Sequence, residues 1–397
     1  MSVRGTKSYF GADAANYKSL EQIFFKITQQ FGAQFIKTSA LQEAKIFFKS
    51  AGSSSDICNK EMFVVENMKI EPGAKTDFDK TVLQPEATAS VVHTLATHHT
   101  TFNHYLRVAY FDRMYRYNRP QKHRLRELTQ AGVEFFGKGV LVDFEAIQCA
   151  VTLLTQLGLI DQVTLRINNI GSAQTRAEYA AVLGQFFQAH QDKISQISEN
   201  PLRTLDKLTA AEKANLPGMP LINQSLPQSL IDSFNELLHL LDLANIKYIV
   251  DPTIIRGLDY YAHTVFEFTT DETTLLAGGR YDTLVSTLTK QDCSGVGWAL
   301  GVERALSYMT EKESTPQLTY LANMNATMHA LKVADHLRQQ GMNILVIDCF
   351  HKDLHKLLRN ANNNHLKEVV LVGENECAAG TYIVKNMQTS VQNIYAL

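Results

Sequence analysis

The stretch Arg256-Gly-Leu-Asp-Tyr-Tyr261 directly precedes an apolar alternating run, Thr264-Val-Phe-Glu267. Alternation of this kind predicts a β-strand. A buried strand rarely carries an unpaired arginine, because a buried charge needs a partner. Arg256 therefore has two interpretations. Its planar fork of donors holds an anion such as a phosphate or a carboxylate, or it forms a buried ion pair with Asp259 or Glu267.

Length and composition are those of an ordinary globular protein with two or three domains: 397 residues, 45% hydrophobic and 20% charged. The sequence has no apolar run of about 18 residues and no signal-peptide layout at its start, so we expect a cytoplasmic protein without a membrane segment. Five well-separated cysteines without a CxxC pair argue against a disulfide framework and a zinc site. A net charge of −2 gives no general attraction for nucleic acid, so RNA binding would need a local basic surface.

Periodicity predicts an antiparallel body over the first three quarters of the chain. A hairpin is predicted where strands at Tyr105–Tyr117 and Thr129–Phe136 flank a charged loop. A helix is predicted over Leu41–Lys49 and a strand over Lys60–Val65. Several prolines between residues 195 and 228 predict short helices and loops there.

A second domain is predicted after the polar segment Glu311–Pro316, which reads as a linker. Beyond it, helices and strands alternate, which is typical of an α/β domain. The predicted elements are a helix at Met328–Gln340, a strand at Asn343–Ile347, a helix at Leu354–Asn363, a strand at Glu368–Val372 and a strand at Thr381–Lys385.

Two further motifs place arginines where they could meet phosphates. Arg116 projects from the first strand of the predicted hairpin, and Arg124 lies in its charged loop. Gly301-Val-Glu-Arg304 opens a predicted helix, whose N-terminus favours anions. Taken alone, the segment has a solvated charged hairpin as its alternative interpretation.

Carboxylates and a basic helix complete the candidate groups. Glu86 with Thr88 suits a substrate ammonium group, whereas Glu134, in an apolar strand, is by itself either a ligand or a hydrogen-bonded structural acid. A basic stripe on one predicted helix can position phosphates or simply be a solvated face. That stripe consists of Lys352, Lys356 and Arg359.

The run RGLDYYAHTVFEF and the later AGGRYD closely resemble the histidine-specific signatures of the histidyl-tRNA synthetase family, which belongs to class II of the aminoacyl-tRNA synthetases. The resemblance extends from Val3-Arg-Gly-Thr-Lys7 to Lys385-Asn-Met387. It implies an α+β fold with an antiparallel sheet of six or seven strands flanked by helices. Residues 1–312 would form the catalytic domain, with a small helical insertion near 172–228. Residues 317–397 would form an anticodon-binding-like α/β domain that lacks the family's usual final helix.

The resemblance also implies a reaction and its residues. Histidine would be activated with ATP and Mg²⁺ and transferred to tRNA(His) by a homodimer, with no metal ligand identified among the protein side chains. Arg256 and Arg116 would be catalytic, beside the α-phosphate. The implied ATP-binding residues are Arg116, Asn118, Arg124 and Arg304, and the implied histidine-binding residues are Glu86, Thr88, Gln130, Glu134, Tyr260 and Tyr261.

Several positions depart from the family's pattern. Gln84 and Ala87 replace an arginine and a glycine, Asn118 replaces an acid, and Ser39 replaces a proline of the dimer-forming strand. Two other interpretations therefore stay open. The chain could be a paralogue that binds histidine as a regulatory subunit of ATP phosphoribosyltransferase, or an enzyme that makes histidyl-adenylate for an acceptor other than tRNA.

Overall fold

The computed structural model describes residues 3–51, 55, 57–65, 80–119, 124–310, 318–349 and 353–397. The chain divides into two compact units, Met1–Lys312 and Glu313–Leu397. Within the described ranges, no helix is both long and apolar enough to cross a membrane. The predicted linker Glu311–Pro316 lies outside the described residues.

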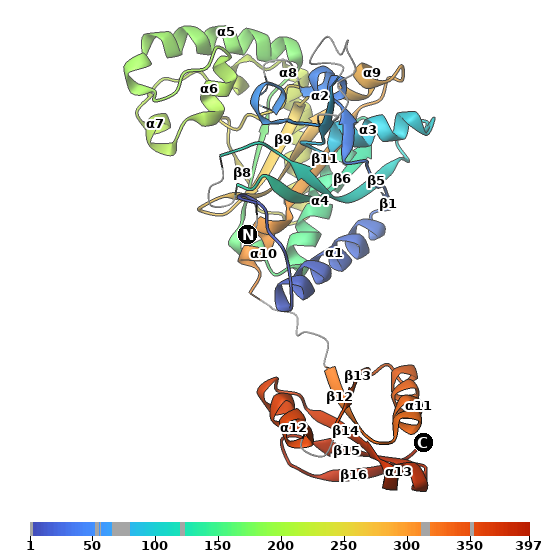
Figure 1. Cartoon of the computed structure of the whole chain (residues 1–397). Helices are drawn as coiled ribbons and strands as arrows, with labels where there is room; N and C mark the ends of the chain where they lie inside the picture. The colour runs from blue at the N-terminus through green and yellow to red at the C-terminus, as the bar shows by residue number, and fades with distance from the viewer. Residues whose placement is uncertain are drawn as a thin grey trace, which may run out of the picture. The chain divides into compact units, whose positions relative to one another are not determined.

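An eight-stranded sheet organises the first unit, in the order β1-β5-β6-β11-β10-β9-β7-β8 (Figure 1). Its six inner strands are antiparallel, and the two-residue edge strands β1 and β8 pair in parallel with their neighbours. The predicted antiparallel sheet is thus confirmed, with the short edge strands added. The strands are β1 Gln34–Phe35, β5 Arg107–Tyr115, β6 Glu127–Phe136, β7 Thr164–Asn169, β8 Ile249–Val250, β9 Ala262–Thr269, β10 Thr274–Tyr281 and β11 Gly295–Gly301.

Helices cover both faces of this sheet, because successive strand residues point to opposite faces. On β9, Phe266 packs into the core formed with helices α1, α4, α8 and α10, whereas Val265 packs into the core on the other face with α3, α5 and α6. The helices of the first core are α1 Ala12–Gln30, α4 Val140–Gln156, α8 Gln228–Leu243 and α10 Val302–Tyr308. On the other face lie α3 Thr88–Thr97, α5 Ala173–Ala189, α6 Pro201–Lys207 and α9 Leu284–Leu288.

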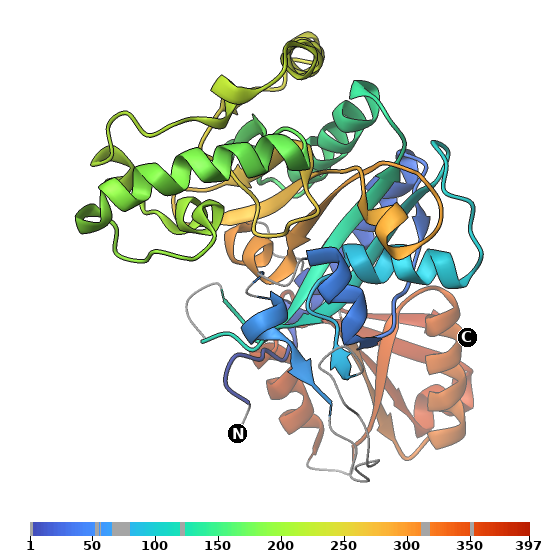
Figure 2. The same cartoon turned by 90° about the horizontal axis from the view of Figure 1, so that it is seen from above.

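Helices α5, α6 and α7 (Ala210–Ala214) form a lobe that stands out from this body (Figures 1 and 2). Helices α6 and α7 fall between residues 195 and 228, where the sequence predicts short helices, and the longer α5 precedes them. Each begins at a residue suited to that place: the side chains of Ser172, Asn200 and Thr209 accept hydrogen bonds from backbone N–H groups of the first turn. Among the described residues, 3₁₀ helices also occur at Ile160–Gln162, Gln191–Lys193 and Ile222–Ser225.

A small three-stranded sheet, in the order β2-β4-β3, differs from the sequence predictions. The predicted helix from Leu41 starts instead with strand β2, Leu41–Glu43, and continues as α2, Ala44–Ala51. The strand predicted over Lys60–Val65 is mostly wrong, because Ile57–Glu61 forms a π-helix and only Phe63–Val64 (β3) is extended. Both strands pair with β4, Thr81–Leu83, a long-range contact that local periodicity does not report.

Two glycines let large side chains lie across the main sheet. A Cβ on Gly297 would lie 1.8 Å from Glu134 Oε2, and a Cβ on Gly278 would lie 2.6 Å from Trp298 Cβ. Gly297 is the direct partner of Glu134 in the β6–β11 ladder, and Gly278 is the partner of Trp298 in the β10–β11 ladder. Each glycine therefore makes room for its cross-strand neighbour.

The second unit is a five-stranded sheet in the order β13-β12-β14-β15-β16, with β12, β13 and β14 parallel. Helices α11 and α12 and strands β13, β14 and β15 match the predicted elements. Strands β12 and β16 and the short helix α13 were not predicted. The elements are β12 Leu318–Met324, α11 Thr327–Gln339, β13 Asn343–Asp348, α12 Asp353–Asn363, β14 Glu368–Gly373, α13 Glu374–Ala379, β15 Thr381–Asn386 and β16 Gln392–Ala396.

Candidate active site

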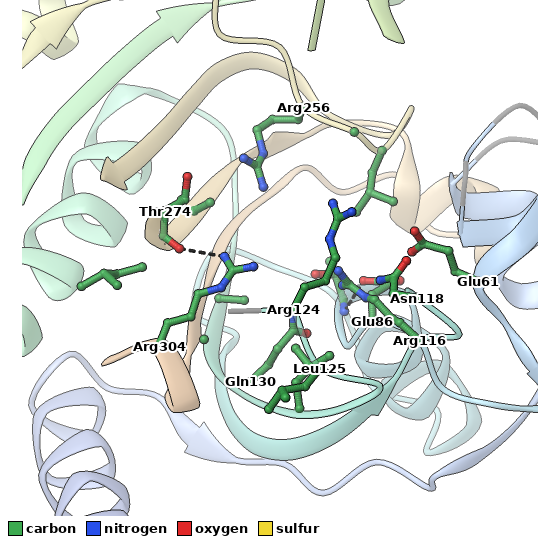
Figure 3. A pocket seen from close by; sticks show the side chains of 18 of the residues that line it. Glu61, Glu86, Arg116, Asn118, Arg124, Leu125, Gln130, Arg256, Thr274 and Arg304 are labelled. Atoms are coloured by element: carbon green, nitrogen blue, oxygen red, sulfur yellow. Dashed lines mark hydrogen bonds between the residues drawn. The ribbon is translucent and has the colours of Figure 1, made fainter. Parts of the chain in front are cut away.

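A cavity of about 540 Å³ opens over the face of the main sheet that carries α3 (Figure 3). The chain positions lining it come from α3, the β5–β6 hairpin, the segment before β9, and α10. Most of the predicted site residues are among them: Glu86, Thr88, Arg116, Asn118, Arg124, Gln130, Arg256, Tyr260, Tyr261 and Arg304.

Four of these residues are arginines whose side chains point into the cavity (Figure 3). Arg116 follows β5, and its Nε donates a 2.7 Å hydrogen bond to the carbonyl of Pro85. Arg304, in the first turns of α10, donates from Nη1 to the carbonyl of Thr274 at 2.8 Å. Hydrogen bonds to backbone carbonyls hold both guanidiniums without neutralising them.

The arginines also perturb one another. Burial lowers the pKa of Arg304, and the charges of Arg116, Arg124 and Arg256 lower it further. Burial likewise lowers the pKa of Arg116. Like charges held close in a partly dry cavity repel, and a multiply charged anion between them would relieve that repulsion. The cavity is therefore suited to a polyphosphate.

Arg256 fits both interpretations drawn from the sequence. Its Nη1 forms an ion pair with Glu267, one of the two predicted partners, and its guanidinium lies 5.8 Å from the ring centre of Tyr261. Burial lowers the pKa of Arg256, but Glu267 and Tyr261 outweigh that effect and raise it overall. Its buried Nε has no hydrogen-bond partner among the described groups. The ion pair thus leaves part of the guanidinium available to a ligand.

Glu86 is a buried acid at the beginning of α3. Its carboxylate accepts hydrogen bonds from the backbone N–H groups of Thr88 (2.8 Å) and Ala89 (3.0 Å), and the hydroxyl of Tyr260 lies 3.5 Å away. Burial raises the pKa of Glu86, while these N–H groups and Arg116 lower it. The acid is thus fixed on the cavity wall, where an ammonium group could pair with it.

Glu134 lies beneath the cavity rather than on its wall. It is 1% exposed and does not line the cavity. Burial raises the pKa of its carboxyl to about 8. The hydroxyl of Tyr281 donates to Oε2 at 2.7 Å, whereas Oε1 has no hydrogen-bond partner within the described structure. An acid of this pKa is mostly protonated at neutral pH and can itself donate a hydrogen bond.

The departures from the family's pattern are accommodated locally. Ala87 adopts φ −94° and ψ −36°, a helical conformation that requires no glycine. Gln84 accepts from Thr38 Oγ1 and donates to the carbonyl of Arg113. Ser39 Oγ accepts the backbone N–H of Leu41 in the turn before β2.

Sequence reasoning did not find every residue on the cavity wall. Arg203 and Asp206 belong to α6, whose residues carry no clear apolar period, so nothing in the sequence places them near Arg256. Glu303 lies within the motif Gly301–Arg304, but the motif predicts no role for its side chain. Both of its carboxylate oxygens accept the backbone N–H of Thr129, at 2.9 and 3.0 Å. Lys7, Glu61 and Tyr110 also line the cavity.

Of the predicted basic stripe, Lys356 and Arg359 are exposed on α12 in the second unit, and Lys352 lies outside the described residues. All five cysteines are free, and only Cys377 is exposed. No group of three or more histidine, cysteine, aspartate or glutamate side chains could hold a metal ion within the described ranges. Acids on the cavity wall, such as Glu61, still fit Mg²⁺, because Mg²⁺ binds through one or two carboxylates together with phosphate oxygens.

Residues 9–305 match the family model for histidyl-tRNA synthetase. Solved structures resemble the whole chain. An apo histidyl-tRNA synthetase from S. aureus is 24% identical, with a TM-score of 0.77, over 100% of this chain and 97% of its own. A histidyl-tRNA synthetase from Nostoc sp. PCC 7120 is 18% identical, with a TM-score of 0.70, over 100% and 96%. A protein described as an ATP phosphoribosyltransferase regulatory subunit/histidyl-tRNA synthetase, from Bacillus halodurans C, is 18% identical, with a TM-score of 0.67, over 94% and 97%.

Proposed function

Since the chain belongs to the histidyl-tRNA synthetase family, we propose that it is a histidine–tRNA ligase that makes histidyl-adenylate from histidine and ATP and transfers histidine to tRNA(His). The proposal rests on one observation: four arginines line the same cavity as Glu86, Thr88 and the two tyrosines. Cations for a polyphosphate and an acid for an ammonium group are the two kinds of contact that activation of an amino acid needs.

In the first step, an oxygen of the histidine carboxylate attacks the α-phosphorus of ATP. A new P–O bond forms, the bond to the bridging oxygen breaks, and pyrophosphate leaves with the electron pair. Arg116 and Arg256 would stabilise the charge at the α-phosphate, while Arg124 and Arg304 would hold the leaving phosphates. Mg²⁺ would supply charge neutralisation on the phosphates.

Histidine recognition would rest on groups on and beneath the cavity wall. Glu86, Thr88 and Gln130 would bind the α-ammonium group, and Tyr260 and Tyr261 would lie beside the side chain. Glu134, neutral at a pKa of about 8, would donate to a ring nitrogen of the imidazole. Asn118 would accept from the adenine amino group through its amide oxygen.

Transfer completes the reaction. The terminal ribose hydroxyl of tRNA attacks the carbonyl carbon of the adenylate, the ester forms, and AMP leaves. The exposed Lys356 and Arg359 would contact tRNA phosphates, as would Lys352. We include a cytoplasmic homodimer in the proposal, because residues 34–43 leave two large apolar side chains exposed, Phe35 at 62% and Leu41 at 52%. A monomer by light scattering at micromolar concentration would exclude the dimer.

The test is histidine-dependent ATP–pyrophosphate exchange, followed by charging of tRNA in the same sample. Arg256→Ala should lower the exchange rate by about 10²–10³-fold, as expected for loss of a preorganised charge stabiliser. Arg113→Ala is the matched control, because Arg113 is an exposed arginine on β5 that pairs with Glu127. Exchange that is insensitive to Arg256 would contradict the assigned role.

A second candidate is favoured by the likeness to the Bacillus halodurans protein. In that case the chain would bind histidine as a regulatory subunit of ATP phosphoribosyltransferase. Histidine binding without any pyrophosphate exchange would support this function. Exchange without tRNA charging would instead indicate an enzyme that makes histidyl-adenylate for another acceptor.

A further inference from the structure

The segment 256–261 carries five residues that line the cavity, yet its backbone is weakly held. They are Arg256, Gly257, Leu258, Tyr260 and Tyr261. Among the described residues, the one hydrogen bond between two of its own backbone groups runs from the N–H of Tyr261 to the carbonyl of Leu258, at 3.5 Å. That distance is at the limit of a hydrogen bond. Side chains from elsewhere must therefore fix the segment.

Two arginines from the inserted lobe converge on one residue of this segment, Asp259. Arg203 of α6 donates from Nη2 to the Asp259 carboxylate at 3.2 Å. Arg176 of α5 donates from Nη2 to the Asp259 backbone carbonyl at 3.3 Å, and from Nη1 to the carbonyl of Gly171 at 3.3 Å. The two inserted helices thus reach the same residue by separate bonds.

The burial of Arg203 strengthens its need for the Asp259 carboxylate. Arg203 is 6% exposed, whereas Asp259 lies at the surface. A buried guanidinium without an acid is strongly unfavourable, so Arg203 holds Asp259 close. Arg203 also packs on the segment itself, because a Cβ on Gly257 would lie only 3.0 Å from Arg203 Nη1.

We propose that Arg176 and Arg203 are positioning residues that fix segment 256–261 through Asp259, so that the inserted helices set the place of Arg256 and the tyrosine pair. The expected effect on pyrophosphate exchange rests on the proposed function, whereas the expected effect on the position of segment 256–261 does not. The inserted lobe is then part of the active-site framework, and whatever moves α5 or α6 also moves Arg256.

The kinetic test uses Arg203→Met, Asp259→Asn and the double variant in the full-length protein. Each single change should lower kcat of pyrophosphate exchange by about 10- to 100-fold, because small displacements of reacting groups are costly. The KM for ATP should stay within about twofold of the wild type, because the other three arginines remain. The double variant should be no slower than the slower single variant. Losses that multiply in the double variant, or an unchanged kcat, would overturn the proposal.

The structural readout is limited proteolysis with chymotrypsin, which needs no activity. Cleavage within residues 256–261 should be faster in Arg203→Met, Asp259→Asn and Arg176→Met than in the wild type, because Tyr260 and Tyr261 are buried only while the segment is fixed. Lys207→Met is the control, because Lys207 is exposed on the same helix and should leave the segment protected. If Arg203→Met fails to fold, Asp259→Asn still tests the proposal, because Asp259 is exposed. A wild type without pyrophosphate exchange would refute the proposed function alone, whereas unchanged proteolytic cleavage in the variants would refute the positioning role of Arg176 and Arg203 alone.

Discussion

Glu134 offers a quantitative test of the structure through the pH dependence of stability. Its carboxyl is 1% exposed, and burial raises its pKa from 4.5 to about 8. Between about pH 4.5 and pH 8, the folded state therefore keeps a proton that the unfolded state has already lost. Stability from the neutral carboxyl is complete below about pH 4.5 and is lost as the pH rises through about 8.

The magnitude follows from the shift. A rise from 4.5 to about 8, at about 1.4 kcal/mol per pH unit, corresponds to up to about 5 kcal/mol of folding free energy. Glu134→Gln removes the titrating group while its amide oxygen can still accept from Tyr281. Relative to this variant, the wild type should lose on the order of 1 kcal/mol for each pH unit between pH 5 and 8.

The assay is urea unfolding followed by fluorescence. The chain has a single tryptophan, Trp298, which is 2% exposed in the core of the first unit. Its emission therefore reports the unfolding of that unit. Glu199→Gln, at an exposed acid, is the control and should follow the wild type at every pH. A free-energy difference between wild type and Glu134→Gln that does not change with pH would refute the reasoning.

Three further predictions concern packing and nucleotide binding. Gly297→Ala should lower the free energy of unfolding by about 1–3 kcal/mol, because the added Cβ would lie 1.8 Å from Glu134 Oε2. Urea unfolding followed by tryptophan fluorescence measures this free energy, and an unchanged value would contradict the close approach. Phe24→Ala should cost about 3–5 kcal/mol in the same assay, since Phe24 is 0% exposed; a loss below about 1 kcal/mol would mean that α1 is not packed as described. Asn118→Asp should lower the KM for ATP by about fivefold, because a hydrogen bond to a charged acceptor is about 1 kcal/mol stronger than one to a neutral acceptor. An unchanged KM in pyrophosphate exchange would contradict the contact between Asn118 and adenine.

The sequence predicted the fold class and ten of the residues that line the cavity, partly from local patterns and partly through the family resemblance. Alternation identified β5, β6 and β9, and the arginines stood out because they interrupt or end apolar runs. Asp259 and Glu267 were both named as partners for Arg256, and the choice between them was open. The strand register and the path of the loop decide it, and neither follows from spacing.

Other features depend on contacts between distant segments. The predicted strand Lys60–Val65 overlaps the π-helix at Lys60 and Glu61, and the pairing of β3 with β4, which sets where the strand begins, is not visible in the local pattern. The depth of Glu134 depends on Gly297, which lies on a different strand. Alternation predicts which face of a sheet a residue occupies, but not whether its cross-strand neighbour leaves it room.

Gly278 and Gly297 also determine how the main sheet can assemble. Each is matched to one bulky partner, Trp298 or Glu134. If β11 slipped by one residue along β6, Glu134 would face Val296 or Trp298, both of which carry a Cβ. A slip along β10 that brought Trp298 opposite Ala277 would also meet a Cβ. Strands made only of similar apolar residues tolerate such slips, with misfolding or aggregation as the result. The two glycines therefore favour the correct pairing of β11 with its neighbours, and Gly297 also makes room for Glu134 beneath the cavity.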